Sequence, residues 1–271
     1  MGEFILKILS YPFIIRAFAV GLPVSLCAAI LGVSLVLRRY SMIGDGLSHV
    51  GFGAIAVAAA LNMAPLQVAI PVVVVAAFFI LRITQNGKTN GDSKIAVIST
   101  GALAIGVMII SLTKGMNTDL NAYMFGSILA IDNSDMVISL IFSGLVLILF
   151  TLFYNMIFSV TFDENFARAT GIKTQLLNVL IAVLTAVTIV LGMRMMGAML
   201  ISALIIFPSL TSMRLFKTFK AVTISSAVIS LVCFILGLLI SCVWAVPTGA
   251  CIVVINLAVL AVVTCCTMRI Q

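Results

Sequence analysis

Residues 221–243 read AVTISSAVISLVCFILGLLISCV and contain no charged side chain. An apolar run of about 20 residues is long enough to cross the hydrocarbon core of a bilayer as an α-helix. Runs of this kind recur along the whole chain. We predict eight or nine spanning helices among these ranges: 15–37, 47–61, 65–83, 95–113, 136–159, 174–192, 196–213, 221–243 and 249–267.

The overall composition agrees with a protein that lies almost entirely in the membrane. Of the 271 residues, 63% are hydrophobic and 8% are charged, whereas soluble domains carry roughly 25% charged residues. A transmembrane β-barrel is excluded because its strands would alternate polar and apolar residues. No stretch is polar enough for a separate soluble domain of about 50 residues. We therefore predict an all-α, polytopic transmembrane bundle, one domain over residues 1–271, which is not itself an enzyme because any ATPase must be on another chain.

The basic residues indicate how the chain is oriented in the membrane. The net charge is +7, but the basic residues stand in short groups between apolar runs rather than in a patch that would bind nucleic acid. If the helices alternate in direction, eleven basic residues fall on one side and four on the other. The positive-inside rule makes the richer side cytoplasmic. We expect the N-terminus outside and the C-terminus inside a prokaryotic cell membrane, with residues 4–15 in the outer interface or a ragged terminus.

Two segments do not fit the pattern of simple spans. Tyr123–Ile131 is apolar but too short to cross, which is typical of a re-entrant or interfacial helix. Thr161–Thr174 is the most polar stretch and lies on the predicted cytoplasmic side. In it, Asp163 can cap the start of a short helix, Phe166 and Ala169 can line one face, and Gly171 can end it. This pattern indicates a docking helix for a soluble partner; a solvated connecting turn is the alternative.

The single histidine of the chain, His49, follows Asp45 by four residues. On a helix these two side chains share one face, about a turn apart. Imidazole with carboxylate can bind Zn²⁺, Mn²⁺ or Fe²⁺, and the glycines around the pair allow another helix or a second copy to come close. Further ligands would have to come from Ser48, Ser202, water, carbonyl groups or a second copy. The alternative is a buried histidine that Asp45 satisfies, with the glycines serving packing only.

Four segments, in this order, resemble the integral membrane permeases of the zinc, manganese and iron class of ABC importers. They are Leu37–His49, Asp163–Ile172, Met196–Pro208 and Val246–Ala250. The resemblance implies a permease homodimer surrounded by membrane lipid, a cytoplasmic ABC ATPase dimer and an extracytoplasmic metal-binding protein. It also implies that Asp45 and His49 serve metal passage. ATPase coupling would fall on Asp163, Glu164, Phe166, Ala167, Arg168 and Gly171.

The chain departs from the family pattern at two points that affect which metal is carried. Phe52-Gly53 stands where a proline commonly precedes the glycine, and no histidine occurs in the C-terminal half. We expect no permanently bound cofactor and a transported Zn²⁺ or Mn²⁺, with iron third. Two alternatives stay open. One is an ABC permease for a chelated metal or a vitamin, and the other is a non-ABC ion transporter or membrane scaffold. An intramembrane metalloprotease is excluded because no His-Glu-x-x-His motif occurs.

Overall fold

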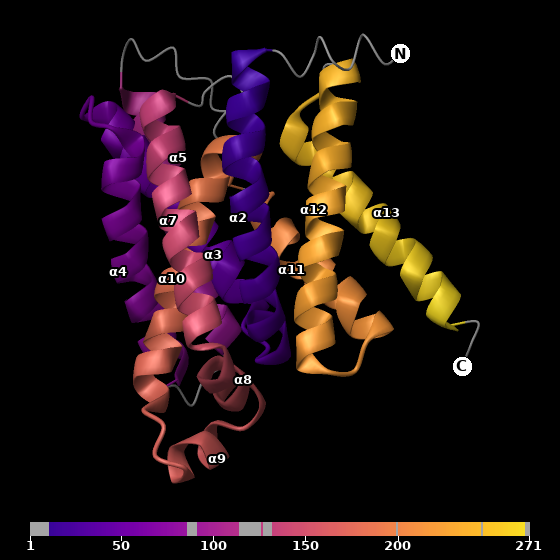
Figure 1. Cartoon of the computed structure of the whole chain (residues 1–271). Coiled ribbons are helices and arrows are strands. Elements are labelled where there is room, and N and C mark those ends of the chain that lie inside the picture. The colour runs from indigo at the N-terminus through magenta and orange to yellow at the C-terminus, as the bar shows by residue number, and fades with distance from the viewer. Residues whose placement is uncertain are drawn as a thin grey trace.

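The computed structural model describes residues 11–85, 91–113, 126, 132–198, 200–244 and 246–268. These residues form helices joined by short turns, so the predicted all-α class is confirmed (Figure 1). The helices are α2 (Pro12–Leu37), α3 (Ser41–Ala60), α4 (Pro65–Gln85), α5 (Gly91–Leu112), α7 (Asn133–Leu152), α8 (Tyr154–Phe162), α9 (Glu164–Ala169), α10 (Thr174–Met196), α11 (Ile201–Leu215), α12 (Phe219–Trp244) and α13 (Thr248–Met268).

Eight helices of the described chain are long and apolar enough to cross a membrane, namely α2, α3, α4, α5, α7, α10, α12 and α13. The ninth apolar helix, α11, has 15 residues. This outcome confirms the predicted eight or nine spans. The predicted re-entrant segment Tyr123–Ile131 lies outside the described residues except for Gly126, as do residues 4–10 of the predicted interfacial stretch.

Three predicted helix boundaries were wrong. Helix α3 begins at Ser41 rather than at residue 47, because neighbouring helices bury its polar, glycine-containing first turns. The run predicted as one helix over 136–159 is divided at Phe153, where α7 ends and α8 begins. Helix α11 begins at Ile201 rather than at residue 196, because Gly197 ends α10 with a φ of +88°, a conformation that favours glycine.

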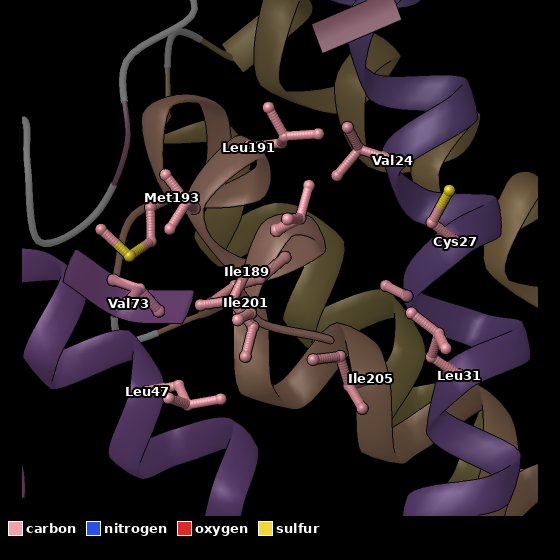
Figure 2. Close-up of a cluster of buried hydrophobic side chains, with 14 of the residues drawn as sticks. Val24, Cys27, Leu31, Leu47, Val73, Ile189, Leu191, Met193, Ile201 and Ile205 are labelled. Carbon is pink, nitrogen blue, oxygen red and sulfur yellow. The ribbon is translucent and has the colours of Figure 1, made fainter. Parts of the chain in front are cut away.

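The core of the bundle lies where α2, α3, α4, α10 and α11 meet. Helix α2 packs against α12, α11, α7 and α10, while α3 packs against α5, α4, α10 and α11. Figure 2 shows apolar side chains from these helices in contact, with Leu47 of α3 facing Ile201 and Ile205 of α11. Helix α3, although rich in small and polar residues, is therefore held inside the bundle by its neighbours.

Glycines on α3 let those neighbours come close. A Cβ atom added to Gly53 would lie 2.8 Å from the backbone carbonyl oxygen of Ala102 on α5, and one added to Gly51 would lie 2.6 Å from the Met193 sulfur on α10. Both distances are shorter than van der Waals contact allows. The predicted role of these glycines, the close approach of another helix, is confirmed within this chain.

Replacing Gly53 with Ala should destabilise the bundle, because the obstructing Ala102 atom is backbone and cannot rotate away. Overpacking of this kind costs about 1–3 kcal/mol, which corresponds to a fall in melting temperature of roughly 2–10 °C. The measurement is thermal unfolding of the detergent-purified protein. Gly101→Ala on α5 is the matched control, because no atom lies within 4 Å of its added Cβ. Equal melting temperatures of the Gly53 variant and the wild type would contradict the close packing of α3 on α5.

Candidate functional site

Asp45 and His49 lie one turn apart near the start of α3 and face each other. The Oδ2 atom of Asp45 is 3.6 Å from Nε2 of His49, and the two side chains are 40% and 16% exposed. The predicted juxtaposition is therefore present in the structure. Nδ1 of His49 is buried and has no hydrogen-bond partner among the described residues. A buried imidazole nitrogen without a partner is destabilising, by about 1–3 kcal/mol.

The separation of the two atoms suits a shared metal ion. A nitrogen–oxygen distance of 3.6 Å is longer than the 2.7–3.2 Å range of a good hydrogen bond. Metal bonds of about 2.1 Å that meet at a tetrahedral angle would hold a nitrogen and an oxygen about 3.4 Å apart. The pair can thus accept a divalent ion between its ligand atoms with little movement of the backbone.

Ser202, from a segment more than 150 residues away, contacts the carboxylate of Asp45. Its hydroxyl donates to Oδ1 of Asp45 at 3.4 Å. Ser202 lies in the first turn of α11, so the carboxylate of Asp45 faces a helix N-terminus, whose partial positive charge stabilises an anion. Ser48, in contrast, donates its hydroxyl hydrogen to the backbone carbonyl of Asp45 at 2.7 Å. Of the two predicted serines, Ser202 therefore bonds to the side chain of Asp45, whereas Ser48 bonds to its backbone.

The site is poor in metal ligands. Within the part of the chain that the structure describes, no group of three or more His, Cys, Asp or Glu side chains is close enough together to hold a metal ion. Two protein ligands are fewer than the four that a closed structural zinc site uses. The pair is therefore not a closed structural metal site.

Thr161–Thr174 contains the predicted short helix, here α9. Asp163 caps it by accepting a hydrogen bond from the backbone N–H of Phe166 at 2.9 Å. Gly171 ends it with a φ of +84°, and the amides of Gly171 and Ile172 bond to the carbonyls of Arg168 and Ala167, which is the Schellman pattern. Figure 1 places α9 at the end of the bundle opposite the start of α2. The predicted docking element is thus a capped, well-defined helix.

The side chains of α9 are divided between the bundle and the surface. Phe166 is 63% exposed, whereas Ala167 is buried against Val160 and Leu177. Phe166 and Ala169, predicted to line one face of the helix, are both exposed, and Ala167 is the residue that packs the helix against the bundle. Arg168 is exposed, and Glu164 turns inward.

Arg38 and Asn178 were not identified as partners of α9 by the sequence analysis. Glu164 contacts Arg38 at the end of α2 and Asn178 on α10. In the sequence, Arg38 is one of the eleven basic residues on the predicted cytoplasmic side, and nothing near it indicates this partner. Asn178 offered a signal, because an amide in an otherwise apolar span needs a polar partner, but nothing local in the sequence identifies that partner.

The segments quoted for the family resemblance meet in pairs. Arg38 contacts Glu164, Asp45 contacts Ser202, and a Cβ added to Gly249 would lie 2.3 Å from the carbonyl oxygen of Met196. Segments that are far apart in the chain thus form one connected structure from α9 to the Asp45–His49 pair and the α10–α11 turn.

Comparisons with known proteins give consistent results over nearly the whole chain. The model of the ABC 3 transport family matches residues 10–267. The chain is 28% identical to the manganese transport system membrane protein MntC of Halalkalibacterium halodurans over 249 residues, which are 92% of this chain and 85% of that protein. It is 29% identical to the high-affinity zinc uptake system membrane protein ZnuB of Haemophilus influenzae over 240 residues, 88% of this chain and 91% of that protein.

A solved structure has the same fold. The structure of PsaBC from Streptococcus pneumoniae in complex with Fab contains a chain that superposes on this one with a TM-score of 0.86 at 28% identity. The match covers 97% of this chain and 94% of that chain. The arrangement of helices described above is therefore also found in an experimentally determined structure.

Proposed function

The chain belongs to the ABC 3 transport family, and from this premise we propose that it is the membrane permease subunit of an ATP-driven importer of divalent transition metal ions. Two of the relatives named above are membrane proteins of a manganese transport system and of a zinc uptake system. The observation that carries the proposal is the Asp45–His49 pair, whose ligand atoms stand 3.6 Å apart inside the bundle.

Manganese or zinc is the proposed cargo. Imidazole with carboxylate oxygen suits both ions, and the named relatives serve manganese in one case and zinc in the other. A low affinity of the site for the ion would suit transport. An ion that binds two protein ligands can be released, whereas a complete four-ligand zinc site would retain it. Among the described residues, no hydrogen bond to Nδ1 fixes the ring of His49, which also favours brief binding.

We assign ATP hydrolysis to a separate cytoplasmic ATPase dimer that docks on α9. The exposed Phe166 on a rigid, capped helix supports this assignment. A second copy of this permease would provide the other half of the pathway and further ligands for the metal. An extracytoplasmic binding protein would deliver the ion at the opposite end. In this arrangement the α9 end of the bundle is cytoplasmic, the N-terminus is outside and the C-terminus is inside.

The test is uptake by the complete importer. The chain is purified with the ATPase that co-purifies with it and is reconstituted in vesicles with its binding protein. We expect ATP-dependent accumulation of radiolabelled Mn²⁺ or Zn²⁺, with the unlabelled form of the carried ion competing best. Vesicles without ATP are the control. Accumulation of a chelated metal or a vitamin, with neither free ion carried, would contradict the proposal.

A further inference from the structure

Arg38, the last residue before the corner between α2 and α3, is held by two partners from other helices. Its Nη2 donates to Oε2 of Glu164 at 2.9 Å, and its Nη1 donates to Oδ1 of Asn178 at 2.5 Å. The amide of Asn178 in turn donates to Oε1 of Glu164 at 3.3 Å. The three side chains therefore form a closed polar triangle that joins α2, α9 and α10.

The triangle is largely sheltered from water. The side chain of Arg38 is 8% exposed and that of Glu164 is 32% exposed. A buried guanidinium needs its anionic partner, because loss of one member leaves the other charge unpaired at low dielectric. The bond from Arg168 to Glu164, at 3.3 Å on the surface of α9, is of the exposed kind that contributes little. Arg38, rather than Arg168, is thus the cation that holds Glu164 in place.

Arg38 also contacts the corner that leads into α3, the helix that carries Asp45 and His49. Its guanidinium carbon lies 5.0 Å from the centroid of the Tyr40 ring, within the range of a cation–π contact. Arg39 makes the corner with a φ of 60°, and α3 begins at Ser41. Asp45 and His49 follow in the second and third turns of α3. One side chain therefore touches both the proposed docking helix and the start of the helix that carries the pair.

We propose that Arg38 is a positioning residue for energy coupling, which transmits displacement of α9 to α3 through Glu164, Asn178 and Tyr40. The inference rests on the proposed function, in which α9 receives the ATPase. The apolar contact of α9 with the bundle depends on the small side chain of Ala167, set against Val160 and Leu177. Without the polar triangle, α9 could shift on that contact and α3 would not follow.

The experiment compares ATP hydrolysed with metal transported by the reconstituted complex. Arg38→Gln should keep the ATPase bound, because Phe166 is unchanged, yet lower uptake by about tenfold or more while hydrolysis falls much less. Glu164→Gln should do the same, and the double variant should be no worse than either single one. Arg38→Lys, which keeps the charge but loses the planar fork, should lie between wild type and Arg38→Gln.

Arg39→Gln is the matched control, because it removes the same charge from the adjacent, exposed position. Its ratio of ATP to metal should stay within about twofold of wild type. If Arg38→Gln does not fold, Asn178→Ala decides, since it keeps the ion pair and should still raise the ratio. An unchanged ratio, independent effects of the two single variants, or loss of the ATPase from Arg38→Gln would contradict this inference alone. A wild-type complex that moves neither Mn²⁺ nor Zn²⁺ would contradict the proposed function instead.

Discussion

Asp45→Asn and His49→Gln should each reduce metal uptake by about a hundredfold or more, while the protein inserts and assembles normally. Asp45→Asn keeps the shape of the side chain but removes its charge, and His49→Gln replaces the imidazole with a neutral amide, so each variant weakens one of the two groups that stand 3.6 Å apart. Mutation of a residue that only supports a metal ligand typically costs about 10- to 100-fold in metal affinity or activity. The described part of this chain holds no group of three or more such side chains, so loss of Asp45 or His49 removes half of what one copy contributes. The measurement is initial uptake of radiolabelled Mn²⁺ and Zn²⁺ by the reconstituted complex.

A control and a direct binding measurement make this first result specific. Asp132→Asn makes the same chemical change at an exposed carboxylate before α7 and should leave uptake within about twofold. Mn²⁺ binding to the purified permease, followed by electron paramagnetic resonance, should weaken in the Asp45 and His49 variants only. Normal uptake by both variants at equal expression would remove the pair from the pathway and favour the alternative, a buried histidine that lies beside Asp45 for structural reasons only.

Phe166→Asp should release the ATPase from the permease. The side chain of Phe166 is 63% exposed on a helix that is capped at both ends. An exposed aromatic side chain on a rigid helix can insert into a pocket of a partner protein. Loss of such an anchor typically costs 2 kcal/mol or more, about 30-fold in affinity. Because the side chain makes little contact with the bundle, the variant should insert and melt as wild type does. The measurement is co-purification of the ATPase, followed by ATP-driven uptake.

The matched control for Phe166 is Asn165→Asp, which adds the same negative charge at the preceding exposed position of α9. A carboxylate in the first turn of a helix is favourable, so α9 should keep its structure and its partner. Retention of the ATPase and normal transport by Phe166→Asp would contradict the docking assignment and favour the solvated connecting turn.

Patterns local in the sequence were sufficient for most of the helices. Apolar runs predicted all eight helices of spanning length in the part of the chain that the structure describes. The i, i+4 spacing placed Asp45 beside His49, and the residues Asp163 and Gly171 predicted both ends of α9. The resemblance of four short segments also identified the family, which the match over residues 10–267 confirms. Hydropathy, helical periodicity and end-capping depend only on residues that are close together in the sequence, so the sequence alone is sufficient to predict them.

Tertiary structure alone decided which distant groups meet. Ser202 reaches Asp45 only because the turn at Gly197 sets the start of α11 against α3. Arg38 is a topology signal in the sequence and a buried link between helices in the structure. Local propensity could not foresee that α3 begins at Ser41, since its first turns are stabilised by the helices that bury them. Such pairings depend on packing between segments more than a hundred residues apart, whose energies no local pattern contains.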